Sequence, residues 1–420
     1  MVKITLKYGH GTLQAALNDD NFGGWLIPKS LAAAKPAEEL VRSALEFPVG
    51  TPKLSELLKP GEKVAIVTSD ITRPCPSAAI LPGVLSEVAR AGVPDCDVVI
   101  VLALGIHRSH SPEEASKLVG PEVYKRYRVI DHDPCRCRLL GTTSRGTPID
   151  VFEEVANADR RIALGNVEYH YFAGYSGGVK AILPGVSSHQ AIRNNHSMMV
   201  LPNARAGVLD GNPVREDLEE LTNHLSLDFI VNVVLGEDKT IRAAFAGHHR
   251  LAHRKACQAL DAFSQAVVPA PGADVILVSA GGFPKDINVY QAQKALDNAA
   301  KAVRPGGVIV WVGACEEGFG EAVFERWLNE AANPKDLIER VKADFELGGH
   351  KAAAIALVLQ RCDVFLVSKL PEATAEKLFV KPFHDLDGAL KAALDRVGPG
   401  GKVLVMPYGG STLPELVPAA

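Results

Sequence analysis

The densest group of residues that could do chemistry in this 420-residue chain is Glu168–Lys180, which reads EYHYFAGYSGGVK. It contains His170 and closes on Lys180. Its glycines permit backbone angles closed to other residues and expose amide groups that could bind an anion. The lysine could instead be a covalent attachment point. The spacing differs from the GxxxxGK[ST] phosphate loop, so we exclude nucleoside triphosphate hydrolysis.

Three shorter segments carry further candidates. The segment SDITRP holds Arg73, which could bind a carboxylate or phosphate through two hydrogen bonds. The segment GIHR holds His107, a candidate acid or base near neutral pH. The segment NNH holds His196, a candidate metal ligand, and the spacing from His189 is not a zinc signature. Each of these alone could also be an ordinary loop residue.

The second half of the chain contains GGFPKDINVYQAQK, which ends at Lys294. Gln291 and Lys294 are three residues apart, so they share one face of a predicted helix. A cation and an amide together suit a carboxylate with a neighbouring hydroxyl, although a solvated helix face is the alternative. Cys135 and Cys137 form a single CxC pair, which is a weak metal signal, and we interpret it as a structural loop. The loop PYGGST near the C-terminus has no assigned role.

These motifs require elements that position them. Apolar runs of strand length alternate with helical stretches such as Ala78–Ala91, which predicts α/β domains with mainly parallel sheets. The Pro- and Gly-rich stretch Ala266–Ala273 predicts a junction between an N-terminal domain, 1–268, and a C-terminal domain, 269–420. Ligands bind beyond the carboxyl ends of parallel strands. The polar motifs mostly follow predicted strands, at Lys63–Ser69, Asp97–Leu102, Tyr127–Ile130, Arg161–Leu164, Val275–Val278, Val308–Val312, Val364–Val367 and Lys402–Val405.

Composition narrows the class of protein. Hydrophobic residues make up 47% of the chain, charged residues 22%, and the net charge is −4, which argues against nucleic acid or an anionic membrane as partner. Seven scattered cysteines and the lack of a signal-like or membrane-spanning apolar run lead us to expect a cytoplasmic protein with reduced thiols.

Taken in order, SDxTRP, GxHR, HxFAGxSGGxK, NNH and GGxPKDxNxYQxxK resemble the nickel-dependent lactate racemase family. The resemblance implies two α/β domains with the active site in the interdomain cleft. It also implies a nickel-pincer nucleotide, which is a pyridinium-3,5-bisthiocarboxylic acid mononucleotide carrying Ni(II), made by separate cofactor-biosynthesis proteins. The roles it implies are cofactor attachment for Lys180, nickel ligation for His196, catalysis for His107 and His170, substrate binding for Arg73, Gln291 and Lys294, and cofactor binding for Asp70, Thr72, Ser176 and Gly177.

The expected activity is inversion of C2 of a 2-hydroxy acid, by a racemase or epimerase, and a homo-oligomer is left open. Lactate-specific members of the family carry a tryptophan near the stretch that here reads GGHKAAA, at Gly348–Ala354. Its absence predicts a substrate larger than lactate, and His350 or Lys351 could hold a second polar group. The alternatives are an oxidoreductase with an exchangeable nicotinamide, a zinc-type hydrolase or lyase, and a non-catalytic binding protein.

Overall fold

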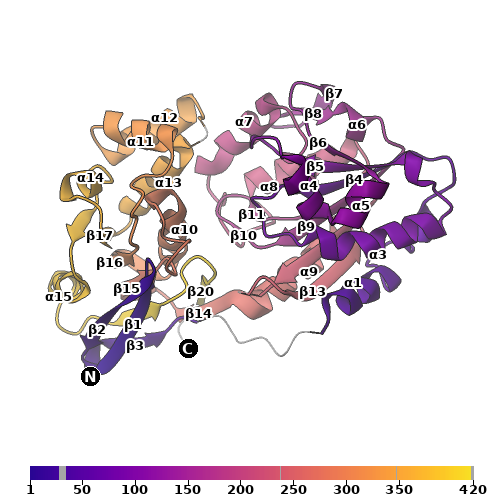
Figure 1. The fold of residues 1–420 in the computed structure, drawn as a ribbon. Coiled ribbons are helices and arrows are strands. Elements are labelled where there is room, and N and C mark those ends of the chain that lie inside the picture. Colours follow the sequence, from indigo (N-terminus) through magenta and orange to yellow (C-terminus); the bar gives the residue numbers. More distant parts are fainter. Residues whose placement is uncertain (28–34, 237, 347, 418–420) are drawn as a thin grey trace. The chain divides into compact units, whose positions relative to one another are not determined.

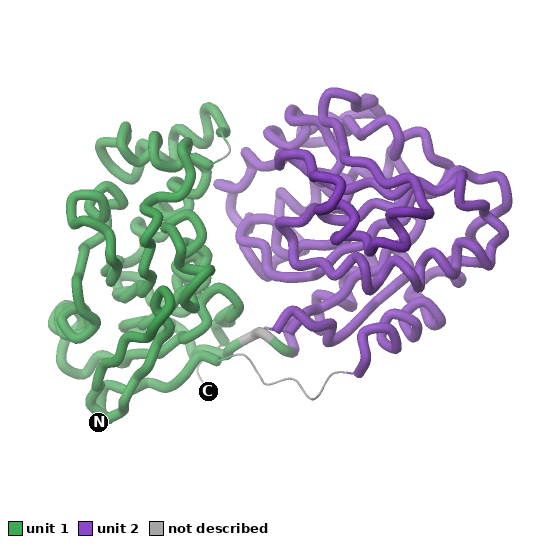
Figure 2. Tube along the Cα trace, viewed as in Figure 1, with its two compact units in different colours: residues 1–29, 263–420 green, residues 30–262 purple. Residues whose placement is uncertain are grey.

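The structure is a computed structural model that describes residues 1–27, 35–236, 238–346 and 348–417. The chain divides into two compact units, each described below by itself (Figure 2). Unit 1 combines residues 1–29 with 263–420, and unit 2 is residues 30–262.

This division differs from the predicted boundaries first because the N-terminal 29 residues join the C-terminal part of the chain. The cause is strand pairing between distant segments. Strand β3, Phe22–Trp25, pairs in parallel with β19, Val403–Met406. The predicted junction also differs, because its first half lies in strand β14, Gln265–Pro269, which pairs in parallel with β20, Leu413–Val417.

Unit 2 is built on a six-stranded sheet in the order β13-β12-β9-β4-β5-β6, and only β13 runs antiparallel to its neighbour (Figure 1). Its inner strands are mostly apolar, as is typical of parallel strands buried on both faces. The residues of Val64–Val67, for example, are all 0% exposed. The strands are β4 Val64–Ser69, β5 Val98–Ala103, β6 Arg128–Asp131, β9 Arg160–Val167, β12 Phe229–Leu235 and β13 Ile241–Gly247.

One face of this sheet packs against a helical layer through a large apolar core. Proline and glycine mark several helix boundaries there: α4 begins with a proline after the cap Ser111, and it ends at Gly120 with φ 94°. The layer consists of α1 Ala37–Glu46, α2 Leu54–Leu57, α3 Ser77–Arg90, α4 Pro112–Val119 and α5 Pro121–Arg126.

Other parts of unit 2 carry the candidate site or support it. They are the strand pair β7 Cys137–Thr142 and β8 Pro148–Phe152, the helices α6 Glu153–Ala156, α7 His189–Ser197, α8 Pro213–Glu219 and α9 Leu251–Ser264, and short 3₁₀ turns at Asp95–Asp97, Gly178–Ala181 (η3), Met198–Val200 and Glu220–Asn223.

Unit 1 is built on an all-parallel six-stranded sheet in the order β18-β17-β16-β15-β19-β3 (Figure 1). A core on one face joins it to helix α15, Leu386–Val397, and to the hairpin of β1, Val2–Tyr8, and β2, Gly11–Leu17. The remaining elements are β15 Ala273–Ser279, β16 Val303–Val312, β17 Asp363–Val367, β18 Lys381–Phe383, a 3₁₀ turn Asp19–Asn21, and helices α10 Val289–Ala299, α11 Ala322–Glu330, α12 Pro334–Ala343, α13 Gly349–Leu359 and α14 Glu372–Glu376.

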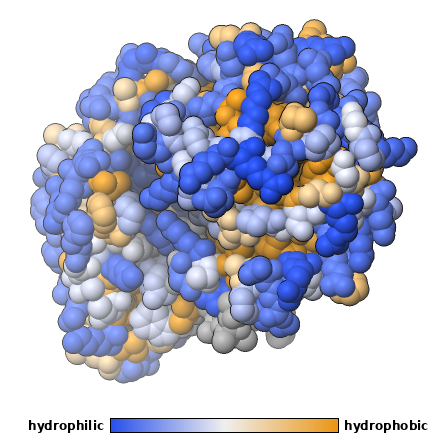
Figure 3. All heavy atoms as spheres, turned by 45° about the vertical axis from the view of Figure 1, so that its right-hand side comes forward, coloured by the Kyte–Doolittle hydropathy of each residue, from blue (hydrophilic) through white to orange (hydrophobic). Residues whose placement is uncertain are grey.

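The predicted α/β class with mainly parallel sheets is confirmed, and each predicted strand is present within a few residues of its expected bounds. The surface seen in Figure 3 is mostly hydrophilic and is broken by smaller apolar patches. Among the described residues, no helix combines the length and the apolar character needed to cross a membrane.

Candidate active site

Three of the predicted motifs follow neighbouring strands of unit 2. Asp70 comes directly after β4, His107 lies four residues after β5, and His170 lies three residues after β9. These strands are adjacent and parallel in the order β9-β4-β5, so their carboxyl ends meet at one edge of the sheet. This is the position that the sequence predicted for ligand binding.

His107 is held by a carboxylate. Its Nδ1 lies 2.7 Å from Asp70 Oδ2 and 3.3 Å from the Thr72 hydroxyl. The other oxygen of Asp70 accepts the backbone N–H of Thr72 at 2.6 Å. Burial acts to raise the pKa of Asp70, but the hydrogen bonds from His107 and Thr72 outweigh it and lower that pKa. An ionised carboxylate only accepts hydrogen bonds, so Nδ1 of His107 donates and Nε2 carries the lone pair of a base.

His170 lies in the short hairpin of β10, Tyr169–His170, and β11, Gly174–Tyr175. Its ring packs edge-on against Phe172, and its Nδ1 accepts the backbone N–H of Ala173 at 3.2 Å. Burial lowers the pKa of His170 well below its usual value, and the charge of Lys180 adds to this. His170 is therefore neutral at physiological pH, and because its Nδ1 accepts a backbone N–H, its ring proton is on Nε2.

Lys180 lies on the 3₁₀ turn η3, which packs against β9 and β4. Its ammonium nitrogen is 6.0 Å from the centre of the Phe172 ring. Burial lowers the pKa of Lys180 well below its usual value, and the charges of Arg215 and Arg73 lower it further. A lysine with a lowered pKa has the neutral amine that covalent bond formation needs.

His196 lies in the last turn of α7 and is 9% exposed. Its ring packs edge-on against Phe172 at 4.8 Å between ring centres. Positive charge on Lys180, His196 or Arg73 lowers the pKa of His170, which means that all three side chains lie near the His170 ring. The structure therefore brings together in unit 2 the predicted metal ligand, the predicted lysine, and one of the two predicted catalytic histidines.

The glycine-rich loop needs its glycines. Gly177 has φ 76°, and a Cβ there would lie 2.8 Å from Asn232 Oδ1. Gly178 has φ 61°, and its backbone N–H donates to the same Asn232 oxygen at 2.9 Å. The Ser176 hydroxyl donates to Asn166 O at 2.8 Å and accepts the backbone N–H of Glu168. Ser176 and Gly177 thus shape the loop that presents Lys180, whatever else they bind.

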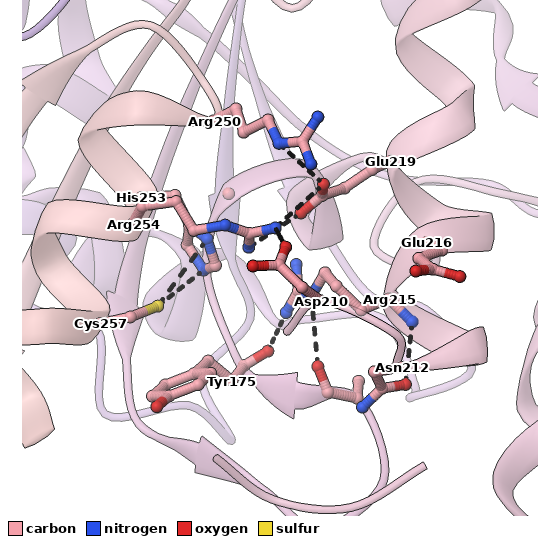
Figure 4. A network of polar contacts seen from close by, with 12 residues as sticks. Tyr175, Asp210, Asn212, Arg215, Glu216, Glu219, Arg250, His253, Arg254 and Cys257 are labelled. Carbon is pink, nitrogen blue, oxygen red and sulfur yellow. Dashed lines mark hydrogen bonds and ion pairs between the residues drawn. The ribbon is translucent and has the colours of Figure 1, made fainter. Parts of the chain in front are cut away.

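Two buried side chains, one on α8 and one on α9, make hydrogen bonds to the backbone of this loop (Figure 4). Arg215, which is 0% exposed, donates from its guanidinium to the carbonyls of Ala173 and Tyr175. His253, 1% exposed, lies with Nε2 2.8 Å from the carbonyl of Ser176. These buried groups fix the backbone of Ala173–Ser176, directly before Gly177 and Gly178.

Two further residues support the site and were not found by sequence reasoning. Asp261 accepts the hydroxyls of Tyr169 and Tyr175, each at 2.8 Å, which ties both strands of the His170 hairpin to α9. His110 accepts the backbone N–H of Ile71 at 3.1 Å, next to Asp70. On a helix, an aspartate is normally interpreted as part of a solvated face, so Asp261 gave no signal.

Gln291 and Lys294 lie on α10 of unit 1, where Asn288 caps the helix by accepting the backbone N–H of Gln291 at 3.0 Å. Gln291 is half-buried and Lys294 is exposed. The preceding loop is held by Asp286, 1% exposed, whose carboxylate accepts the backbone N–H groups of Gly9 and Ala314. These two candidates therefore belong to a different unit from the histidines and Lys180.

The residues at the position of the missing tryptophan lie inside unit 1. Ala352, Ala353 and Ala354 are at most 4% exposed. Lys351 Nζ lies 3.5 Å from the centre of the Tyr290 ring and donates to the Tyr290 carbonyl at 2.6 Å. The alanines thus fill the interior, while Lys351 contacts the residue that precedes Gln291. Burial lowers the pKa of His350 to about 3.

No group of three or more histidine, cysteine, aspartate or glutamate side chains that could hold a metal occurs among the described residues. The fold and the site together are those of an α/β protein whose candidate acid–base and lysine residues follow the carboxyl ends of parallel strands.

Comparisons with known proteins identify the family. Residues 8–207 match the family model of the lactate racemase N-terminal domain, and residues 268–413 match that of the lactate racemase C-terminal domain. The chain is 34% identical over 425 residues to a lactate racemase of Thermoanaerobacterium thermosaccharolyticum, covering 98% of this chain and 99% of that protein. It is 32% identical over 421 residues to a lactate racemase of Lactiplantibacillus plantarum, covering 97% and 99%.

Solved structures agree. The lactate racemase apoprotein of T. thermosaccharolyticum superposes with a TM-score of 0.90 at 33% identity, over 99% of this chain and all of that one. A Thermotoga maritima protein at 20% identity shares the fold, with a TM-score of 0.64 over 92% of this chain and all of that one. The chain belongs to the lactate racemase family and is an isomerase that acts on a hydroxy acid.

Proposed function

We propose that this protein inverts C2 of a 2-hydroxy acid with a nickel-pincer nucleotide tethered to Lys180. The observation that carries the proposal is geometric: His170, His196 and the side-chain nitrogen of Lys180 all lie around the Phe172 ring. A lysine for attachment and an imidazole for nickel are therefore close together, and burial lowers the pKa of that lysine. When bound, the cofactor would accept and return a hydride at C2. His196 would hold the nickel through its imidazole, a ligand type that nickel accepts, and the cofactor would supply the other ligands.

The side chains of this protein supply the remaining chemistry. His107 takes the hydroxyl proton on Nε2, and Asp70 stabilises the imidazolium that forms. His170, neutral because of burial, serves the opposite enantiomer, and to accept a proton on Nε2 its own ring proton must move from Nε2 to Nδ1, which gives up the hydrogen bond from Ala173. Arg73, Gln291 and Lys294 hold the carboxylate and the neighbouring hydroxyl, while Asp70, Thr72, Ser176 and Gly177 shape the cofactor site. Maturation would depend on separate cofactor-biosynthesis proteins, and the cytoplasm is the proposed location.

The test is intact-mass measurement with metal analysis on protein matured in the presence of the biosynthetic enzymes. Wild-type protein should carry the cofactor mass and one nickel, whereas Lys180→Ala should lack the adduct. Lys294→Ala is the matched control, since it removes an exposed lysine of the other unit and should retain the adduct. An unchanged adduct on Lys180→Ala would remove the attachment claim.

We further propose that the preferred substrate is larger than lactate. The support is the missing tryptophan together with Lys351, whose ammonium group contacts Tyr290 beside the candidate substrate residues. The buried alanines add no support, because they fill the interior of unit 1. The test is a panel of aromatic, branched, dicarboxylic and sugar-derived 2-hydroxy acids. At least one of them should be turned over with a higher kcat/KM than lactate. Lactate as the best substrate would refute this proposal.

A further inference from the structure

The candidate nickel ligand His196 stands at the end of a chain of buried polar side chains. Its Nδ1 lies 3.2 Å from Asn195 Oδ1. Asn195 Nδ2 donates to Asp217 Oδ2 at 2.8 Å, and Asp217 Oδ1 accepts the hydroxyl of Thr143. Asn195 and Asp217 are 0% exposed and Thr143 is 5% exposed. This relay joins α7 to α8 and to the turn between β7 and β8.

The direction of every hydrogen bond in the relay is fixed by its chemistry. The Thr143 oxygen accepts the backbone N–H of Thr147 at 3.1 Å and donates its own proton to Asp217. The Asn195 atom that faces Asp217 also faces a backbone carbonyl, which can only accept, so this atom is the NH₂ group. The carbonyl of Val214 accepts from the same NH₂ group at 3.1 Å. The Asn195 oxygen therefore faces His196.

An amide oxygen cannot donate, so Nδ1 of His196 carries the ring proton and donates it to Asn195. In a neutral ring the lone pair is then on Nε2. We propose that Thr143, Asp217 and Asn195 are positioning residues that fix the tautomer and orientation of His196, so that Nε2 is the ligating atom. The inference rests on the proposed function for His196 being a metal ligand and for the identity of the metal, whereas the tautomer and orientation of the ring follow from the relay alone.

A buried carboxylate at the far end of such a relay also affects the ligand itself. Partners that accept the second ring proton of a metal-binding histidine make the histidine a stronger ligand and hold its plane. Low surrounding dielectric strengthens each bond of the relay. If the relay only joined α7 to α8, it would stabilise the fold without requiring a particular tautomer of His196. The tautomer of His196 therefore distinguishes a positioning role from a purely structural one.

The test uses ¹⁵N-labelled, metal-free, full-length protein, with the ring nitrogens of His196 assigned by comparison with His196→Gln. Two-bond ¹H–¹⁵N spectra should show wild-type His196 protonated on Nδ1. Asn195→Leu removes the acceptor, so the Nε2-protonated form should appear. The double exchange Asn195→Asp with Asp217→Asn keeps an acceptor facing His196 and should restore the Nδ1-protonated form. Asn194→Ala, which removes the neighbouring amide on α7, should leave the tautomer as in wild type.

An Nε2-protonated ring in wild-type protein, or an unchanged ring in Asn195→Leu, would overturn the inference. After maturation, Asn195→Leu should hold nickel about 10–100-fold less tightly than wild type, as is typical when such a partner is removed. Nickel held equally well by both would also overturn it. If wild-type protein acquires no nickel while its ring is protonated on Nδ1, the proposed function fails and the positioning of His196 stands.

Discussion

At the scale of residues, the two candidate bases differ in their supports. His107 is paired with a carboxylate, whereas His170 is held by a backbone amide and aromatic rings. Neither contact is visible in the sequence, because Asp70 and His107 are 37 residues apart and Ala173 is an ordinary loop residue. The motifs predicted which residues matter, and the structure adds the atoms through which they act.

Replacing either histidine by alanine should lower kcat strongly and leave nickel in place. Positioned acid–base groups contribute about 10²–10⁴-fold to rate, so each of His107→Ala and His170→Ala should lose activity within that range. His196→Ala should instead lose nickel. Steady-state kinetics and metal analysis on the same matured preparations give both readouts. Wild-type turnover by either base variant would contradict its assignment.

Asp70 should matter for both rate and stability. Burial acts to raise its pKa, but hydrogen bonds from His107 and Thr72 lower it, so the folded value lies below the unfolded one. The stability that ionised Asp70 contributes is therefore complete above about pH 4 and is lost as pH falls through the folded pKa. Asp70→Asn should be less stable than wild type at pH 7, with a smaller difference at pH 3.

The same variant should lose about 10²-fold or more in kcat, because the amide can present a donor to His107 and disturb its tautomer. Urea unfolding at the two pH values and steady-state kinetics provide the measurements. Asp387→Asn, at an exposed site in unit 1, serves as the control and should show neither effect. Equal destabilisation by Asp70→Asn at both pH values would argue against the pairing.

At the scale of elements, most strands could be predicted from the sequence. The long-range strand pairing and the buried side chains that hold the loops in place could not. Runs such as Val64–Val67 are apolar throughout, so local pattern alone predicted the strands that contain them. Strand β3 contributes FGGW, which has no strand-like pattern, and it joins the sheet only through pairing with β19, far along the chain. Arg215 on α8 would normally be interpreted as a solvated charge, yet it is fully buried behind the glycine-rich loop.

Arg215 should therefore be a major determinant of stability in unit 2. Arg215→Met removes the donor for two buried carbonyls, and each unsatisfied acceptor costs about 1–3 kcal/mol, which predicts a loss of about 2–6 kcal/mol in unfolding free energy. Arg250→Gln removes an exposed ion pair with Glu219 and should cost less than about 1 kcal/mol. Denaturant titration compares the two, and equal costs would show that Arg215 is not the support we describe.

At the scale of the whole molecule, the candidate site residues are distributed over the two units. The histidines and Lys180 come from residues 30–262, and Gln291 and Lys294 come from residues 263–420. The sequence predicted that these residues lie in different domains, but not that β3 completes the sheet of unit 1, because that pairing depends on contacts across almost the entire chain.

The most direct test of the account follows the hydrogen at C2. A single enantiomer of a 2-hydroxy acid carrying deuterium at C2, from the panel above, is incubated in ordinary water with matured, nickel-loaded protein. Transfer of that hydrogen as hydride predicts that the substrate racemises or epimerises while deuterium remains at C2, measured by chiral separation with mass spectrometry. Loss of deuterium to water at the rate of inversion, or no inversion of any panel member by nickel-loaded protein, would contradict the account.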